Sequence, residues 1–121
     1  MGYESKIYVV EKTSIIDNEK RYAQEIATFK LGKIYFLSDV LRNNPITDCF
    51  VYADDGNTQV IEDRYGDALT ESTIEEVISI LEKAVSNGED YRRIFPLLST
   101  LNTIKERREQ WGNIAVLHFG Y

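Results

Sequence analysis

Two consecutive apolar stripes with helical spacing constrain this chain more than any other feature of its sequence. In each stripe the apolar residues recur three and four positions apart, which places them on one side of an α-helix. The stripes are formed by Ile74, Val77, Ile78, Leu81 and Val85, and by Ile94, Leu97, Leu98, Leu101 and Ile104. Because a helix with one apolar side must bury that side against another layer, the pair predicts a sheet with both helices on one face.

The residues at the ends of the stripes predict the limits of the two helices. Either Ser72 or Thr73 can cap the first helix, with a glutamate three residues later completing a capping box. Asn87-Gly88 is typical of a left-handed helix end. In the second stripe Pro96 fits only the first turn, so that helix is expected to begin near Phe95.

Apolar runs bounded by turn residues predict the strands. The expected strands cover residues 6–12, 22–31, 49–53, 58–62 and 114–119. The second is ambiguous, because Ala27 and Leu31 fit both a helical spacing and an alternation with Phe29, and the strand is preferred. A short helix capped by Ser38 is expected to follow it. The last strand contains neither proline nor a charged residue, so it is expected inside the sheet rather than at its edge.

Asp55-Gly56 is the clearest turn signal in the chain, and it lies between the third and fourth expected strands. This dipeptide can supply the two positive-φ positions of a type I′ turn. It therefore predicts a tight hairpin at this point. Residues 13–20 are largely polar and are expected only to connect the first two strands.

These elements predict an α+β fold: a mainly antiparallel sheet of about five strands, two longer helices packed on one face, and the C-terminal strand in the interior. The 121 residues, 43% of them hydrophobic, suit a single domain spanning residues 1–121. Neither a signal-peptide core nor an apolar run of about eighteen residues occurs. A cytoplasmic protein without membrane contact is therefore expected.

The residues that could carry chemistry are few. Cys49 is the only cysteine and lies in an expected strand, so a buried thiol is expected. His118 is the only histidine; it shares a strand face with core residues and is expected to be a core or partner-facing side chain. One cysteine and one histidine cannot form a zinc site, and Asp54 to Asn57 fits a turn better than a calcium loop. No catalytic residue, metal or cofactor is expected.

The charge of the chain is concentrated in its middle. The net charge is −6, and the segment from Asp54 to Asp90 holds eleven carboxylates against two cations, Arg64 and Lys83. Such a segment repels phosphates, so direct binding of nucleic acid is not expected. It favours a basic protein partner instead. Tyrosine is a common interface residue, and Tyr3, Tyr65 and Tyr121 are candidates for a protein-binding surface.

Three segments carry a resemblance to known sequences: MGYESKIYVVEK at residues 1–12, QEIATFKL at 24–31 and LHFGY at 117–121. They resemble small uncharacterised proteins encoded by bacteriophages and prophages. The resemblance implies no catalytic residues, but it implies a setting in which small single-domain proteins often act on host machinery.

Charge and resemblance together favour a non-enzymatic phage accessory protein that binds and modulates a host protein with a basic groove. Imitation of the charge of a nucleic acid is one way in which it could bind there. Glu71, Glu75 and Glu82 are expected close to one outward face of the first long helix. The expected partner-binding residues are Asp67, Glu71, Glu75, Glu82 and Tyr65.

Two other classes of function remain open. One is a structural or assembly module that works as a homodimer, through pairing of sheet edges or through an exposed tyrosine patch. The other is a small-molecule-binding protein or a metal-dependent hydrolase, which would require a pocket around His118, Glu62 and Asp63.

Overall fold

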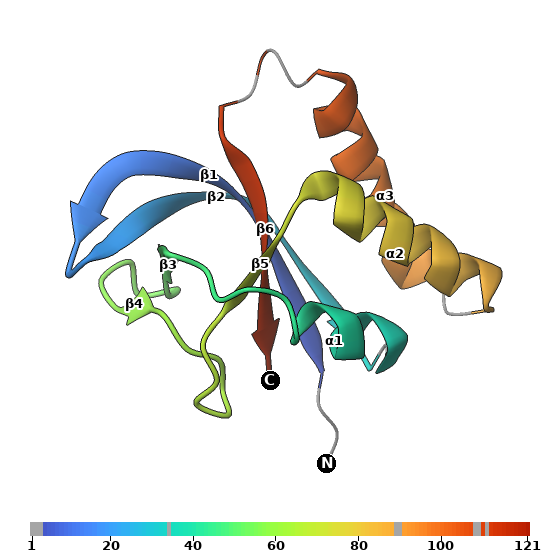
Figure 1. Cartoon of the computed structure of the whole chain (residues 1–121), viewed down its shortest axis with the longest axis horizontal. Helices are drawn as coiled ribbons and strands as arrows, with labels where there is room; N and C mark the ends of the chain where they lie inside the picture. Colours follow the sequence, from blue (N-terminus) through green and yellow to red (C-terminus); the bar gives the residue numbers. More distant parts are fainter. Residues whose placement is uncertain (1–3, 34, 89–90, 108–109, 111) are drawn as a thin grey trace.

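The computed structural model describes residues 4–33, 35–88, 91–107, 110 and 112–121. A curled sheet with two long helices on one side forms the body of the protein (Figure 1). In chain order the elements are β1 (Ser5–Asp17), β2 (Lys20–Gly32), α1 (Tyr35–Leu41), β3 (Cys49–Tyr52), β4 (Gln59–Val60), β5 (Thr70–Ser72), α2 (Ile74–Ser86), α3 (Tyr91–Glu106) and β6 (Ile114–Gly120).

The sheet has six strands in the order β4-β3-β2-β1-β6-β5. All neighbours are antiparallel except β2 and β3, which run parallel over a short stretch. The predicted α+β fold is confirmed, and so is the interior position of β6, which lies between β1 and β5. The strand missing from the prediction is β5, because its sequence Thr-Glu-Ser carries no apolar signal.

The tight hairpin of this fold lies between β1 and β2. Asn18 and Glu19 have φ values of 53° and 67°, and they separate the paired residues Asp17 and Lys20. Two consecutive positive-φ residues in a two-residue loop are the mark of a type I′ turn. The prediction that residues 13–20 form a simple connection was therefore wrong, since both strands extend to the turn.

The loop at Asp55-Gly56 has a different form. The pairing of β3 with β4 ends at Tyr52 opposite Gln59, and a six-residue loop joins the two strands. Gly56 has a φ of 74°, whereas Asp55 lies outside the positive-φ region, so the predicted type I′ turn is wrong. Hydrogen bonds from the Thr58 side chain and from the Thr58 and Asn57 amides lower the pKa of Asp55 to about 2. The hydrogen bonds that the Asp55 carboxylate accepts therefore hold the loop in its conformation, in place of a type I′ turn.

The limits of α2 follow the prediction. The Thr73 hydroxyl accepts a hydrogen bond from the Glu76 amide at 3.2 Å, so Thr73 is the cap. Gly88 has a φ of 84° just beyond the C-cap residue Asn87. Only glycine adopts this conformation without strain, which explains why the helix ends there.

The other two helices begin earlier than expected. α3 starts at Tyr91, and Pro96 lies inside it rather than in its first turn. Ile94 and Leu97 in the first turns are both fully buried. The stability gained from burying them outweighs the loss of the backbone hydrogen bond that proline cannot donate. α1 starts at Tyr35, so Ser38 lies within the helix and is not its cap.

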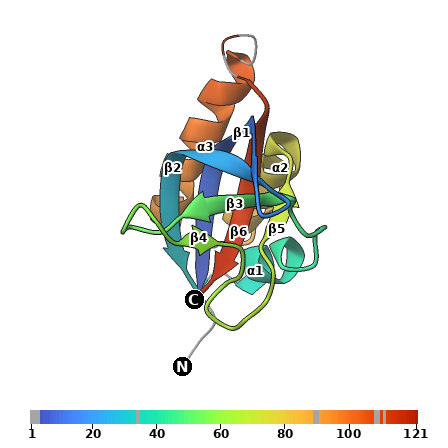
Figure 2. The ribbon, with the colours of Figure 1, turned by 90° about the vertical axis from the view of Figure 1, so that its left-hand side faces the viewer.

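Each face of the sheet has its own apolar core. One core packs α1, α2 and α3 against residues such as Ile7, Val9 and Val116. The other contains Tyr8, Val10 and Leu117 and lies under β3 and β4, which cross in front of β1 and β6 in Figure 2. Neighbouring residues of β1 and β6 therefore point into different cores, as alternation along a strand requires. Among the described helices, none combines the length and apolar character needed to cross a membrane.

Candidate functional site

His118 lies at the end of β6, beneath α1, and is only 4% exposed. Its neighbours on the flanking strands are Ile7 of β1 and Thr70 of β5. The His118 Nε2 atom is 2.9 Å from the hydroxyl of Ser5, and that hydroxyl is 2.5 Å from the hydroxyl of Ser38 on α1. These bonds link the beginning of β1, the end of β6 and α1 through buried polar side chains.

The environment of His118 favours its neutral form. Burial lowers the pKa of His118 to about 4, with Asp63 acting in the opposite direction and Arg42 adding to the decrease. The ring is therefore uncharged at neutral pH. Ser5 is completely buried and does not line the adjoining pocket, so the pair of Ser5 and His118 holds the structure together rather than presenting a nucleophile. Of the two predicted positions for His118, in the core or facing a partner, the structure shows the buried one.

A polar pocket of about 290 Å³ lies beside His118. It is bounded by the end of α1, by the segment that follows it, and by the loop before β5. The pocket is lined by Arg42, Asn43, Asn44, Ile46, Asp63, Asp67, Ala68, Thr70 and His118. Of the residues expected around a pocket, His118 and Asp63 are brought together, whereas Glu62 lies outside the lining.

The turn from residue 63 to residue 67 forms one rim of this pocket. The Asp63 Oδ1 atom accepts hydrogen bonds from the amides of Tyr65, at 2.8 Å, and Asp67, at 3.0 Å. Gly66, with a φ of 83°, allows the chain to reverse. The Arg64 amide also donates to the carbonyl of Gly120 at 3.0 Å, which attaches the turn to the end of β6. Tyr65 and Asp67 are therefore exposed on a firmly held loop.

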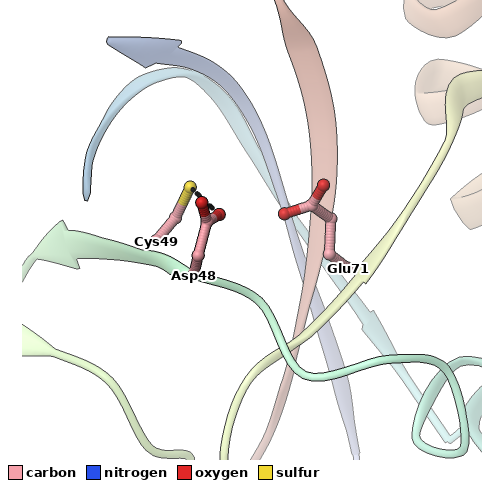
Figure 3. Close-up of side chains that lie close together, drawn as sticks. All are labelled: Asp48, Cys49 and Glu71. Atoms are coloured by element: carbon pink, nitrogen blue, oxygen red, sulfur yellow. Dashed lines mark hydrogen bonds between the residues drawn. The ribbon is translucent and has the colours of Figure 1, made fainter. Parts of the chain in front are cut away.

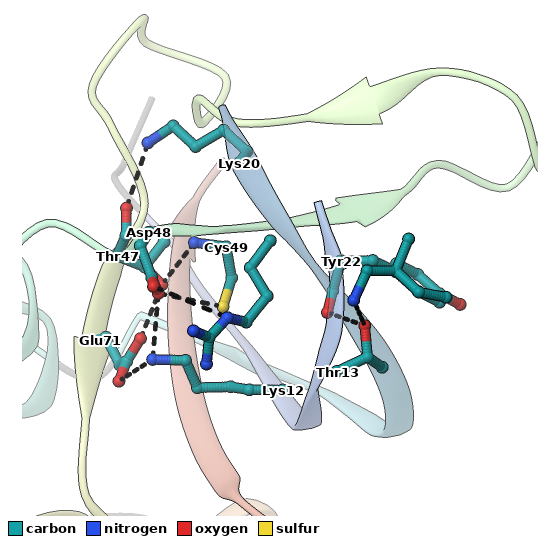
Figure 4. A network of polar contacts seen from close by, with 10 residues as sticks. Lys12, Thr13, Lys20, Tyr22, Thr47, Asp48, Cys49 and Glu71 are labelled. Carbon is teal, nitrogen blue, oxygen red and sulfur yellow. Dashed lines mark hydrogen bonds and ion pairs between the residues drawn. The ribbon is translucent and has the colours of Figure 1, made fainter. Parts of the chain in front are cut away.

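A second polar group, the Lys12 cluster, consists of Lys12, Thr47, Asp48 and Glu71 (Figure 4). The Lys12 ammonium is 3.0 Å from Asp48 and 3.2 Å from Glu71, and the Thr47 hydroxyl donates to Glu71 at 2.7 Å. Burial alone would lower the pKa of Lys12, but hydrogen bonds to both carboxylates outweigh it and raise the pKa. The cluster joins β1 to β5 and to the segment before β3.

The same region contains the set of possible metal ligands found among the described residues. One ligand atom each of Asp48, Cys49 and Glu71 lies within 4.8 Å of the others. Figure 3 shows these three side chains. Burial raises the pKa of the Cys49 thiol to about 11, so the thiolate that a soft metal requires is scarce at neutral pH. The Lys12 ammonium already lies between the two carboxylates, and the Arg21 guanidinium lies 4.0 Å from Asp48. We therefore interpret this group as an ion-pair cluster.

Replacing Lys12 by Met is expected to lower the free energy of unfolding by about 1–3 kcal/mol, because Glu71 then lies partly buried without its cation. Exposure of the Asp48 side chain, 56%, keeps the loss below that of a fully buried pair. Urea unfolding at pH 7 measures the effect. Lys83→Met on the exposed side of α2 is the control, and an equal loss in both variants would contradict the role of the cluster. The double variant Lys12→Met/Glu71→Gln should be only slightly less stable than Lys12→Met alone, since both substitutions remove the same ion pair.

The structure separates the residues predicted to bind a partner. Tyr65 and Asp67 belong to the turn beside the pocket, and Glu75 and Glu82 border a shallow hollow on α2 together with two lysines. Glu71 lies on β5, inside the Lys12 cluster, because α2 begins only at Ile74. The prediction that these glutamates share a face of one helix was therefore wrong. Tyr121 is partly buried, and Tyr3 lies outside the described residues.

Sequence reasoning did not find the residues that organise these polar groups. Ser5 and His118 are 113 positions apart, and Lys12 and Glu71 are 59 apart, so no local spacing connects them. Their pairing follows from the adjacency of β1, β6 and β5 in the sheet.

Comparisons of this chain with protein-family models, with curated proteins and with solved structures found no match.

Proposed function

We propose that this chain is a non-enzymatic binding protein that acts in the cytoplasm and recognises a basic partner protein through its turn surface. The turn surface consists of the polar pocket, its lining residues Ile46 and Asp67, and Tyr65 on the turn that borders it. The observation that supports it is the exposure of two large side chains: Ile46, which lines the polar pocket, is 67% exposed, and Tyr65, on the turn that borders the pocket, is 52% exposed. Exposed apolar and aromatic groups beside a polar pocket are typical of protein-binding sites.

The charge of the turn surface fits a basic partner. Asp67 is exposed, and its backbone is fixed by hydrogen bonds to Asp63, so it presents a carboxylate with little loss of entropy on binding. An approaching lysine or arginine would be steered by the acidic middle of the chain and would meet Asp67 at the pocket rim. The resemblance to phage proteins makes a host protein the natural candidate for this partner.

The test uses Tyr65→Ala and Asp67→Asn. A partner is first captured from a bacterial lysate and identified, and its binding kinetics are then measured with purified proteins at two ionic strengths. Loss of the Tyr65 ring should weaken binding about tenfold, mainly through faster dissociation. Loss of the Asp67 charge should slow association and flatten its dependence on salt.

Glu82→Gln, on α2 and away from the turn surface, is the matched control and should bind like the parent. If the turn variants also keep the parent's rates at both ionic strengths, the turn surface is not the binding site. Circular dichroism of each variant shows whether the fold is retained.

One observation favours the homodimeric module as a second candidate. β2 pairs with β3 only at Arg21 and Tyr22, although β2 continues to Gly32. In the described part of the chain, the remainder of β2 thus has a strand on one side only, and a second copy could extend the sheet there. The register shift near Val9 and Val10, with the exposed charges of Glu25 and Lys30, works against such pairing. The molar mass in solution decides between the two candidates.

A further inference from the structure

A second hollow, the lysine groove, opens on the opposite face of the sheet from the His118 pocket. It has a volume of about 410 Å³, within the range of small-molecule sites. β1, β2 and β6 form its floor, and the β3–β4 loop forms one wall. The residues used below are Lys6, Lys30, Tyr8, Phe119, Tyr52 and Asp54.

The floor of the lysine groove is aromatic. The rings of Tyr8 and Phe119 lie edge to face, with centroids 6.3 Å apart and planes at 86°. The Lys6 ammonium lies over both rings, 4.9 Å from the centroid of Tyr8 and 5.5 Å from that of Phe119. Tyr52, which is 41% exposed, adds a third ring at the wall. A planar ligand ring would find apolar surfaces here on which to stack.

The two lysines of the groove are held close together. Lys6 of β1 lies directly opposite Lys30 of β2, and Phe119 of β6 lies directly opposite Lys6 on its other side. Directly opposed residues point to the same face of a sheet, with their Cβ atoms about 4.5–5.5 Å apart, and like charges in this position repel. Within the described residues, neither ammonium has a carboxylate at ion-pair distance.

We propose that the lysine groove binds a small anion that carries a planar ring, such as a nucleoside monophosphate. Two lysines at directly opposed strand positions and without ion-pair partners among the described residues are unexpected in a chain with a net charge of −6. A phosphate between Lys6 and Lys30 would offset the repulsion of their like charges. The ring of the ligand then lies against Phe119 and Tyr52.

Two carboxylates in the groove define the orientation of such a ligand. Glu25 is paired with the hydroxyl of Thr28 on the same strand. Asp54 lines the wall formed by the β3–β4 loop, whereas the two lysines belong to the β1 and β2 floor. The phosphate therefore faces the lysine side, and sugar hydroxyl or base amino groups, which are hydrogen-bond donors, face Asp54.

The experiment titrates the purified protein with AMP by isothermal calorimetry, alongside inorganic phosphate and adenosine, each of which supplies only half of the ligand. AMP should bind at least about tenfold more tightly than either half, because ring and phosphate are recognised together. Equal binding of AMP and inorganic phosphate, or no binding of AMP at millimolar concentration, would overturn the proposal.

Variants locate the site. Lys30→Gln and Phe119→Leu should each weaken AMP binding about tenfold, the first by loss of charge and the second by loss of stacking. Lys105→Gln on α3 removes the same charge elsewhere and should leave the affinity unchanged. Without ligand, Lys30→Gln should melt at the same or a higher temperature than the parent, since it removes a repulsion. Unchanged AMP affinity in a folded Lys30→Gln protein would exclude this groove as the site.

Discussion

Deletion of residues 114–121 is expected to abolish cooperative unfolding. β6 pairs with β1 over seven residues, from Ser5 to Glu11, and with β5 on its other side. It also contributes Val116 to one core and Leu117 to the other, both essentially fully buried. Burial of a valine or leucine contributes about 1.5–3 kcal/mol each, while a whole domain is stable by only about 5–15 kcal/mol. The loss of these side chains and of both strand pairings therefore removes most of the stability.

Thermal unfolding followed by circular dichroism, together with the dispersion of amide NMR signals, measures this result. Val116→Ala is the control: it should lower stability by about 1–2 kcal/mol yet keep a single sharp transition. A synthetic peptide of residues 112–121 added to the truncated protein should restore the transition. A truncated protein that melts sharply near the temperature of the parent would show that β6 is not essential to the sheet.

The stability of the protein is expected to fall by about 3 kcal/mol between pH 6.5 and pH 4 because of His118 alone. Burial lowers the pKa of His118 from 6.5 to about 4, so the unfolded chain takes up a proton in this window before the folded chain does. Proton uptake by the unfolded state favours unfolding as the pH falls, at about 1.4 kcal/mol for each unit of pKa difference. The stabilisation is complete above pH 6.5 and is lost as the pH approaches 4.

Urea unfolding at several pH values, for the parent and for His118→Gln, isolates this contribution. The variant cannot take up the proton, so its stability should depend less on pH in this window, whatever its stability at pH 7. The lowered pKa of Asp48, held by its hydrogen bond to Lys12, affects stability mainly below pH 4, outside the window. A direct NMR titration of the His118 ring that gives a pKa near 6.5 would refute the expectation.

The parts of the fold that the sequence predicts well are those with a long periodic signal. The stripe from Ile74 to Val85 predicted α2, and the residues flanking it predicted a cap at Ser72 or Thr73, of which Thr73 is used, and the end at Asn87-Gly88. The uninterrupted apolar run at residues 114–117 predicted an interior β6. The elements that were predicted wrongly or missed are those in which only a few residues carry the sequence pattern. β5 has three polar residues, and it is a strand only because β6 lies beside it.

Turn chemistry was misjudged for a related reason. Asp55-Gly56 favours a type I′ turn locally, but Asp55 uses its carboxylate to cap a longer loop, and the tight turn forms at Asn18-Glu19. There the pairing of two thirteen-residue strands compensates for the positive φ of two residues other than glycine. The hydrogen bonds and side-chain contacts of a long pair of strands stabilise the fold by more than the few kcal/mol by which a local sequence favours one turn type over another.

For the candidate sites, residue type was a better guide than position. Tyr65 and Asp67 were predicted on the surface and are exposed on the turn that borders the polar pocket. His118 was predicted as a core or partner-facing side chain and is buried. Glu71 looked like one more surface carboxylate, but it lies opposite Lys12 once β5 joins the sheet. Which charge is paired depends on contacts between distant segments, and a single sequence does not encode these locally.

The place of β6 beside β1 also affects how a nascent chain can fold as it leaves the ribosome. The β1–β2 hairpin connects neighbouring segments and can form within microseconds of its synthesis. The partner of β1 on its other side, by contrast, is translated roughly a hundred residues later, and contacts of such high contact order slow folding. Until then β1 keeps an open edge and both cores lack the side chains of β6, such as Val116 and Leu117, so the emerging chain is a substrate for chaperones that shield apolar segments.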